Sequence, residues 1–308
     1  MGEDEIVGEE GSAHATALRA AAEIERLAGS PIEPGLYLVS TPIGNLADIT
    51  LRALSVLVRA DVIYCEDTRH SRTLLSHYSV RATLRPYHEH NAEEQRPRIL
   101  AELVAGKTVA LISDAGTPLI SDPGFKLVRD AAVAEHLVVA IPGASAVLTA
   151  LPISGLPTDA FFFAGFLPTR EGARRTRIEE LAGVPGSLVF FESPGRAGAA
   201  LKDLADVLGA RPAALARELT KLHEDVVRGS LAELAERFAN VEPKGEVVLV
   251  VGPPAEGMTS DADIEAQLET ALKHWSVRDA AKAVSDALKV PKARVYDIAL
   301  KVKQREKD

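Results

Sequence analysis

Three short loops rich in glycine and proline carry the backbone groups best suited to hold a small ligand. They are Ser40–Asn45, Ser113–Gly124 and Pro142–Ala146, and each follows a short apolar run. Small residues let a backbone approach a ligand and offer it N–H and C=O groups. In open α/β sheets, such loops meet beyond the carboxyl ends of the strands. Any one loop could be only a tight turn, but three in one domain favour a shared ligand site.

Two groups of charged side chains could move a proton or hold a phosphate. The first group, Glu66, Asp67 and Arg69, follows the apolar run Val62–Cys65. The second group follows a later apolar run and consists of Arg217, Glu218, Lys221, His223 and Glu224. A carboxylate in either group could accept a proton from a hydroxyl while a neighbouring cation binds a phosphate. The candidate catalytic residues are therefore Glu66, Asp67, Arg69, Glu218 and Lys221, with structural ion pairs and helix caps as the alternative.

Basic residues gather in two places, although the whole chain carries a formal charge of −9. Residues 1–34 hold eight acidic and two basic residues, a net of −6, which leaves −3 for residues 35–308. Residues 271–308 hold ten Lys or Arg against five Asp or Glu, a net of +5. Phosphate binding depends on the local patch, so the acidic total does not exclude RNA, though either stretch could be a solvated or packing face. The other candidate RNA-binding residues are Arg170, Arg174, Arg175, Arg177 and Arg196.

The usual nucleotide-binding and hydrolase signatures are missing from the sequence. It has no G-x-G-x-x-G after its first apolar run, no G-x-x-x-x-G-K-[ST] and no G-x-S-x-G. His88-Glu89-His90 alone is weak support for a metal site, and we expect no metal. Cys65 is the only cysteine, and the sequence shows neither a secretory signal pattern nor an apolar run of membrane-spanning length. We therefore expect a reducing cytoplasm as the location.

Short apolar runs alternate with stretches of helical spacing along most of the chain. We predict strands at Leu36–Ser40, Val62–Cys65, Thr108–Ile112, Leu137–Ile141, Phe161–Ala164, Ser187–Phe191, Ala213–Ala216 and Val247–Val251. We predict helices at Thr50–Arg59, Arg69–His77, Ala92–Ala105, Gly124–Ala134, Ala144–Leu151, Glu171–Leu181, Arg196–Leu208 and Leu231–Ala239. This alternation predicts an α/β protein with largely parallel sheets.

Breaks in this rhythm divide the chain into four parts. Residues 1–34 form an acidic extension that we expect to be mostly disordered, with helical spacing near Ala13–Leu27. A break at Leu151–Thr158 separates an N-terminal α/β domain, residues 35–150, from a second α/β domain, residues 158–252. Residues 260–308 form a small module similar to a helix-turn-helix, which we expect to bind RNA. Its three predicted helices are Ile264–Trp275, Val277–Leu288 and Lys292–Lys303.

Six stretches of the chain carry a pattern that is specific to one protein family. They are Leu36–Thr73, Ala110–Gly124, Ile141–Ala146, Phe163–Pro168, Val189–Arg196 and Arg217–Gly229. Three motifs within them, STPIGNL, EDTR and SDAGTPLISDPG, are the most specific. In these residues the chain resembles the tetrapyrrole methylase superfamily, and the C-terminal module is similar to one found in that family. The resemblance implies the two-domain α/β architecture of class III methyltransferases, with a small helical module appended.

The resemblance also implies a cofactor, S-adenosylmethionine, bound in a folded pose between the two α/β domains. The backbone of Ala115–Thr117 would lie near its methionine part, with Ile120 and Ala144 as apolar walls. Residues of the second domain, including the strand near Glu246–Leu249, would close over the adenine. The implied cofactor-binding residues are Pro42, Gly44, Asn45, Asp114, Ala115, Gly116, Thr117, Ile120, Ser121, Ala144, Phe166, Leu167 and Glu192.

One departure from the family pattern bears on the substrate. Ala115-Gly116-Thr117-Pro118 stands where the precorrin enzymes carry Gly-Gly-Asp-Pro, which favours the branch that methylates ribosomal RNA. The resemblance then implies methyl transfer to the 2′-hydroxyl of a cytidine ribose in small-subunit ribosomal RNA, free or in the assembled small ribosomal subunit, by a homodimer. The alternatives are a methylase of a corrin-like tetrapyrrole and a non-catalytic RNA-binding or ribosome-assembly protein on the same fold.

Overall fold

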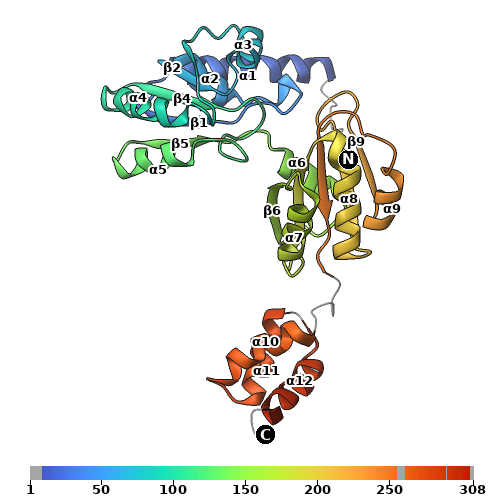
Figure 1. Ribbon diagram of the computed structural model, residues 1–308. Helices are drawn as coiled ribbons and strands as arrows, with labels where there is room; N and C mark the ends of the chain where they lie inside the picture. The colour runs from blue at the N-terminus through green and yellow to red at the C-terminus, as the bar shows by residue number, and fades with distance from the viewer. Residues whose placement is uncertain (1–8, 255–260, 289, 306–308) are drawn as a thin grey trace, which may run out of the picture. The chain divides into compact units, whose positions relative to one another are not determined.

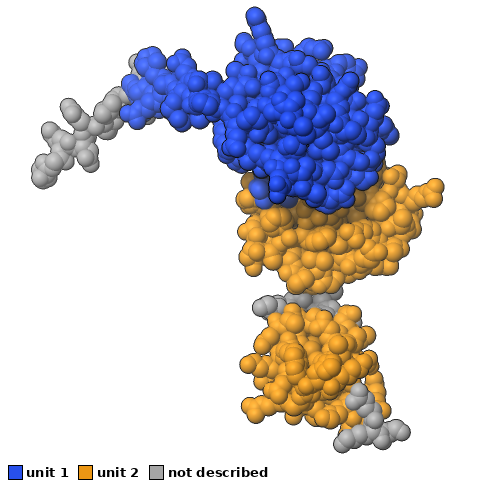
Figure 2. All heavy atoms as spheres, turned by 90° about the vertical axis from the view of Figure 1, so that its left-hand side faces the viewer, with its two compact units in different colours: residues 1–149 blue, residues 150–308 orange. Residues whose placement is uncertain are grey.

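The chain divides into two compact units, residues 1–149 and 150–308 (Figure 2). A computed structural model describes residues 9–254, 261–288 and 290–305. The division lies inside helix α6 (Ala146–Ser154), beside the break predicted at Leu151–Thr158. Each unit contains one five-stranded sheet.

The first unit is built on a parallel sheet with the strand order β3-β2-β4-β1-β5 (Figure 1). Every pairing in it is parallel. Its strands β2 and β4 are short apolar runs with every residue buried, as expected where helices cover both faces. Since all the strands point the same way, the loops that follow them emerge at one edge. The strands are β1 (Gly35–Val39), β2 (Val62–Cys65), β3 (Leu84–Pro86), β4 (Thr108–Ile112) and β5 (Val138–Ile141).

Helices cover both faces of this first sheet because alternate strand residues point to opposite sides. Tyr37 and Val39 of β1 lie in the core formed with α2 and α3, whereas Leu36 lies in the core formed with α4 and α5. Thr50 begins α2 as an N-cap, its hydroxyl accepting a hydrogen bond from Ala53 N. The helices of this unit are α1 (Glu9–Gly29), η1 (Leu46–Asp48), α2 (Leu51–Arg59), α3 (Thr68–His77), α4 (Ala92–Val104), α5 (Phe125–Val133) and the first part of α6.

Helix α1 corrects the expectation that the N-terminal extension is mostly disordered. Residues 9–29 are helical, over a longer range than the helical spacing at Ala13–Leu27 indicates. Ile24 and Ile32 pack against the core of the first domain, and Arg59 Nη1 donates to the Ser30 carbonyl at 2.6 Å. These contacts order the segment, and its composition alone could not reveal them. Residues 1–8 of the extension lie outside the described residues.

The second sheet has the strand order β6-β7-β10-β8-β9 and is mixed. Only β6 and β7 pair in parallel, and the other pairings are antiparallel. The prediction of largely parallel sheets is therefore wrong here. The loop 218–224 joins β8 directly to β9 without a helix, which suits antiparallel neighbours, and β10 lies between β7 and β8. The strands are β6 (Phe161–Phe166), β7 (Ser187–Glu192), β8 (Pro212–Arg217), β9 (Asp225–Ser230) and β10 (Val247–Val251).

Two sets of helices complete the second unit. Helices α7, α8 and α9 form the core on one face of the mixed sheet. Helices α10, α11 and α12 form a separate core of their own and correspond to the three predicted C-terminal helices. Within the described ranges, no helix is long and apolar enough to cross a membrane. The helices are α7 (Glu171–Leu181), α8 (Pro194–Leu208), α9 (Leu231–Arg237), α10 (Asp261–Leu272), α11 (Val277–Leu288) and α12 (Lys292–Arg305).

Candidate active site

The three glycine- and proline-rich loops meet at the carboxyl edge of the first sheet. Thr41, after β1, and Gly116, after β4, each donate a backbone N–H to the other's carbonyl, with N···O distances of 2.9 and 3.1 Å. The hydroxyls of Ser40 and Thr117 lie 3.0 Å apart. Thr41 Oγ1 also donates to the Ser113 carbonyl at 3.1 Å. The first and second loops are therefore fastened together by backbone and side-chain bonds.

Two glycines make this approach, and that of the third loop, sterically possible. Gly116 has a φ of +84°, and a Cβ there would lie 3.3 Å from Ile43 Cγ2 and 3.6 Å from the Ala144 carbonyl oxygen. A Cβ on Gly143 would lie only 2.8 Å from Ser40 Cβ. The structure thus brings together the loops that the sequence singled out, and a larger residue at either position would push them apart.

The joined loops leave backbone groups open to solvent. Pro42 of the first loop and Gly116 of the second loop are buried. Leu119 and Ser121 have positive φ angles of 72° and 67°. For a residue with a side chain this conformation costs on the order of 1–2 kcal/mol, and it tends to occur at functional sites. Of the predicted cofactor-binding residues, Gly44, Asn45, Ala115, Ile120 and Ser121 are exposed, and Asp114, Thr117 and Ala144 are partly exposed.

The cofactor-binding residues predicted in the second domain are mostly interior. Leu167 is 2% exposed and belongs to the core, and Glu192 is 3% exposed. Burial raises the pKa of Glu192, while the Ser193 N–H and Arg196 act in the opposite direction. The Glu192 carboxylate accepts from Ser193 N at 2.8 Å and pairs with Arg196, 3.1 Å from Nε to Oε1. The side chains of Leu167 and Glu192 are thus buried, whereas Phe166 is 55% exposed, and the contact of these three residues with adenine stays a prediction.

Asp67 and Arg69 are held in a helix cap and an ion pair. Asp67 Oδ1 accepts from Arg69 N at 2.7 Å as the N-cap of α3, and Oδ2 pairs with Arg69 Nη2 at 2.9 Å. These hydrogen bonds lower the pKa of Asp67 to about 2, which makes it a weak base. The backbone N–H of Asp67 donates to Asp114 Oδ1 at 3.1 Å, so the segment after β2 is tied to the second loop. These contacts match the alternative interpretation of Asp67 as a helix cap and ion-pair partner, and its catalytic role stays an untested prediction.

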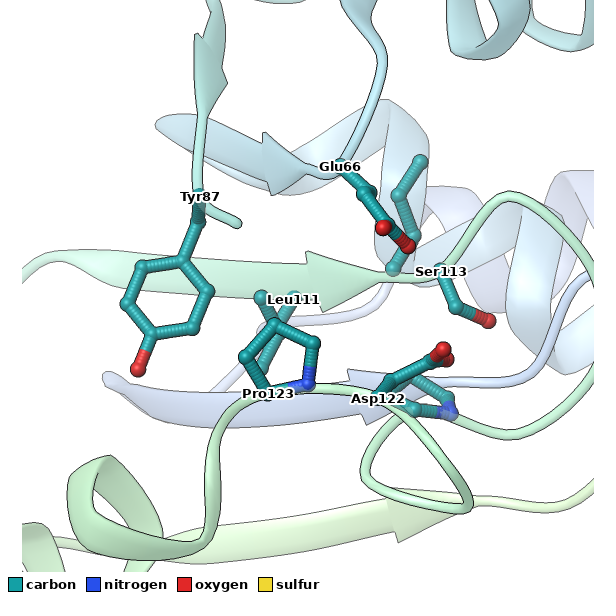
Figure 3. A pocket seen from close by; sticks show the side chains of 8 residues that line it. Glu66, Tyr87, Leu111, Ser113, Asp122 and Pro123 are labelled. Carbon is teal, nitrogen blue, oxygen red and sulfur yellow. The ribbon is translucent and has the colours of Figure 1, made fainter. Parts of the chain in front are cut away.

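A small pocket lies beside these loops and contains a carboxyl group that the sequence analysis did not select. Figure 3 shows the carboxyl groups of Glu66 and Asp122 directed into the same space, with the Ser113 hydroxyl next to them. Burial, and next the charge of Glu66, raise the pKa of Asp122 to about 6, against a smaller opposing effect of Ser113. The lining residues are Glu66, Tyr87, Leu111, Ile112, Ser113, Pro118, Asp122 and Pro123.

Asp122 lies inside the quoted motif SDAGTPLISDPG, so the sequence did contain a signal for it. A second acidic residue in a ligand loop was a reasonable candidate, but its proximity to Glu66 depends on the tertiary structure. Within the described part of the chain, no three His, Cys, Asp or Glu side chains gather in a way that could hold a metal ion.

The second group of candidate catalytic residues forms a compact ion-pair cluster. Lys221 Nζ lies 2.9 Å from Glu218 Oε1 and 3.1 Å from Glu246 Oε2. The hydrogen bond from Lys221 lowers the pKa of Glu218. Burial opposes the charged form of Lys221, but its hydrogen bonds to the two carboxylates raise its pKa overall. Glu218 is therefore a weak base, and Lys221 is a fixed cation. His223 is exposed, and Glu224 accepts from Thr220 N at 2.6 Å.

The arginine-rich segment, residues 170–177, forms ion pairs with acidic residues of the second domain that neutralise most of its charge. Arg174 is 7% exposed and lies 2.6 Å from Asp203, which is 2% exposed. Arg175 pairs with Asp203 at 3.2 Å and with Asp206 at 3.0 Å. Arg177 pairs with Glu180, four-tenths of its side chain remaining exposed, and Arg196 is engaged by Glu192. Arg174 is unavailable to a phosphate, which corrects that part of the RNA-binding prediction, whereas Arg170 is exposed.

The two-sheet architecture with ligand loops at one strand edge is that of a known class of methyltransferase fold. A solved structure of uroporphyrin-III C-methyl transferase from Thermus thermophilus, complexed with S-adenyl homocysteine, matches with a TM-score of 0.51 at 24% sequence identity. The match covers 71% of this chain and 97% of that one. At this level of identity the likeness establishes the fold.

The chain belongs to the tetrapyrrole methylase family. Residues 35–235 match the model described as Tetrapyrrole (Corrin/Porphyrin) Methylases, and residues 259–303 match the one described as RsmI C-terminal HTH domain. Ribosomal RNA small subunit methyltransferase I of Mesorhizobium japonicum is 52% identical over 262 residues, 84% of this chain and 88% of the relative. The protein of the same name from Erythrobacter litoralis is 47% identical over 273 residues, 89% of this chain and 97% of the relative.

Proposed function

We propose that this protein is an S-adenosylmethionine-dependent methyltransferase that methylates a cytidine ribose 2′-hydroxyl in small-subunit ribosomal RNA. The observation that carries the proposal is the identity of 52% over 84% of the chain to a protein named as a ribosomal RNA small subunit methyltransferase. Such a substrate is found in the cytoplasm, so we propose that the enzyme acts there. A homodimer remains a prediction of the family resemblance, and light scattering of the purified protein tests it.

The loops of the first domain fit the proposed cofactor. S-adenosylmethionine supplies a methyl group already activated on a positively charged sulfur, so we expect no metal requirement. Gly116 and Gly143 place no side chain at the meeting point of the loops, and Ala115 is an exposed residue whose backbone N–H and C=O groups would bind the amino acid part. Ile120, 46% exposed, supplies an apolar surface. The loops would therefore orient the methyl group and exclude water from one side of it.

We propose that the C-terminal module is the main RNA contact, because the arginine-rich segment is largely paired internally. The module exposes Trp275 (55%) and Tyr296 (39%), whose rings can stack on unpaired bases. Its exposed basic residues can neutralise phosphates without reading sequence. These residues are Lys273, Arg278, Lys282, Lys292, Lys301, Lys303 and Arg305, the last of which pairs with Glu265.

The proposal is tested by incubating the purified protein with S-adenosylmethionine and small-subunit RNA, either free or in the assembled subunit. Nucleoside mass spectrometry should find a 2′-O-methylated cytidine in one of the two substrates. Methylation of a corrin-like tetrapyrrole instead, or binding of RNA without methylation, would support an alternative function.

The RNA contact is tested with the double substitution Lys301→Glu and Lys303→Glu. We expect weaker RNA binding and a salt dependence reduced by about one unit of slope for each lost phosphate contact. Lys202→Glu, on the exposed side of α8, makes the same kind of charge change outside the module and serves as the control. Equal binding by all three proteins across a salt series would remove the module from the RNA-binding surface.

A further inference from the structure

Three neighbouring strands of the first sheet each contribute the residue that directly follows them to one pocket. Glu66 follows β2, Tyr87 follows β3 and Ser113 follows β4, and these strands are adjacent in the order β3-β2-β4. Asp122 reaches the same pocket from the far end of the second loop (Figure 3). The pocket therefore lies where ligands bind in open α/β sheets, beyond the carboxyl ends of the strands.

Among the described residues, the charged groups that act on the partly buried Asp122 include no cation. The charged groups that act on it are Glu66, after β2, and Asp114, after β4, and both are acidic. Tyr87, after β3, is the remaining titratable lining residue, and burial raises its pKa, so it stays neutral. A half-buried carboxyl group that faces only acidic and neutral neighbours is not placed there to stabilise the fold.

The second loop connects this pocket to the proposed cofactor site. Gly116 of this loop forms backbone hydrogen bonds with Thr41, and the Thr117 hydroxyl lies 3.0 Å from that of Ser40. Five residues beyond Thr117, the same loop carries Asp122 into the pocket. One short segment thus holds both the backbone groups proposed for the cofactor and a carboxylate able to accept a proton.

We propose that Asp122, in the pocket lined by Glu66, Ser113 and Tyr87, accepts the proton of the ribose 2′-hydroxyl during methyl transfer. The inference rests on the proposed function. The ribose oxygen forms a bond to the methyl carbon as the carbon–sulfur bond breaks, and the electron pair of that bond stays on sulfur. The hydroxyl proton passes to the Asp122 carboxylate and then to solvent, which leaves the enzyme unchanged. Glu66 is a positioning residue whose negative charge makes Asp122 a stronger base.

The environment of Asp122 suits this role. Its pKa of about 6 leaves it ionised at neutral pH and yet more basic than an ordinary aspartate. Asp67 and Glu218, two of the three carboxylates first considered, have lowered pKa values because cations bind them. Compared with Asp67 and Glu218, Asp122 is the carboxylate whose surroundings favour accepting a proton.

The first test compares single-turnover methylation by Asp122→Asn, Asp122→Glu and the parent enzyme. We expect Asp122→Asn to lower the rate by about 10²–10⁴-fold, the usual contribution of a general base, and Asp122→Glu to recover part of it. Affinity for S-adenosylhomocysteine, measured by calorimetry, should stay close to that of the parent. Asp159→Asn, at an exposed position before β6, is the matched control. A rate for Asp122→Asn within about tenfold of the parent, or loss of cofactor affinity, would overturn the assignment.

The second test uses pH, and its main readout requires no turnover. Nuclear magnetic resonance of carboxyl carbons in the cofactor-free protein should show Asp122 titrating near 6 in the parent and at a lower pH in Glu66→Gln, because a like charge has been removed. The acidic limb of the methylation rate should move in the same direction. An unchanged Asp122 titration in Glu66→Gln would overturn the role of Glu66. A parent enzyme that does not methylate ribosomal RNA would defeat the proposed function, whereas an active parent with an active Asp122→Asn defeats only this inference.

Discussion

Asp122 in the first domain is partly buried and Asp203 in the second is 2% exposed, and the charges around them are opposite. Asp203 forms ion pairs with Arg174 at 2.6 Å and with Arg175 at 3.2 Å. Asp122 faces Glu66 and Asp114, and its pKa rises to about 6. A buried charge that serves the fold is matched by cations, because leaving it unmatched costs several kcal/mol. We therefore interpret Asp122, which has no cationic partner in the part of the chain that the structure describes, as a functional residue and the ion-paired Asp203 as a structural one.

The largest expected loss of stability follows from removing the cation beside Asp203. Arg174→Met should lower the free energy of unfolding of the second domain by about 3–5 kcal/mol, since it leaves a buried carboxylate with only the partly exposed Arg175. Denaturant unfolding measures the loss. Arg177→Met is the control, because the partly exposed Arg177–Glu180 pair should contribute only about 0–1 kcal/mol. Similar values for the two variants would mean that the Arg174–Asp203 pair is solvent-screened.

A smaller effect is expected where the loops of the first domain meet. Gly116→Ala and Gly106→Ala both place a side chain at positive φ, +84° and +72°, which should cost roughly 1 kcal/mol each. Only at Gly116 does the new Cβ meet neighbours, Ile43 and Ala144, whereas nothing lies within 4 Å at Gly106. We expect S-adenosylhomocysteine to bind more weakly to Gly116→Ala alone, as measured by calorimetry. Equal affinities for the two variants would place the cofactor away from the joined loops.

The smallest effect is a gain in stability on removing the unmatched charge. The pKa of Asp122 in the folded protein, about 6, lies above the ordinary aspartate value of 3.8, so ionisation is unfavourable in the folded state. Stability from this group is present below 3.8 and is lost as pH rises through 6. At pH 7, the free energy of unfolding of Asp122→Asn should therefore exceed that of the parent by on the order of 1 kcal/mol, after discounting for solvent exposure. The variant should also unfold at a higher temperature. The difference should vanish near pH 4. A variant less stable than the parent at neutral pH would show that Asp122 supports the fold.

Much of the fold could be predicted from local pattern, since buried strands and amphipathic helices leave a clear periodicity. Val62–Cys65, Thr108–Ile112 and Val247–Val251 are strands with the predicted bounds. β3 was missed because its three residues, Leu84–Pro86, include arginine and proline, and β9 was missed because Asp225–Ser230 is mostly polar. The mixed second sheet was missed because strand direction depends on pairing between distant segments.

The candidate site was predictable in its backbone and much less so in its charges. The three loops could be located because glycine and proline mark tight turns directly in the sequence. Arg174 was misassigned although Arg174, Ile178 and Leu181 recur at helical spacing and share the buried face of α7. That periodicity could have shown the arginine pointing inward. Its partner Asp203, however, lies on α8, and no local pattern identifies it.

The C-terminal helices have a core of their own, built from residues such as Ile264, Val284 and Ile298. A segment with its own apolar core can melt independently of the remaining chain. A module of fewer than about 50 residues usually has a small apolar core. We therefore expect the C-terminal helices to unfold less cooperatively and at a lower temperature than the two α/β domains. Heating would then give more than one heat-absorption peak, and a single melting temperature would not describe this protein. The stability of each variant should therefore be measured from the unfolding transition of the domain that carries the substitution.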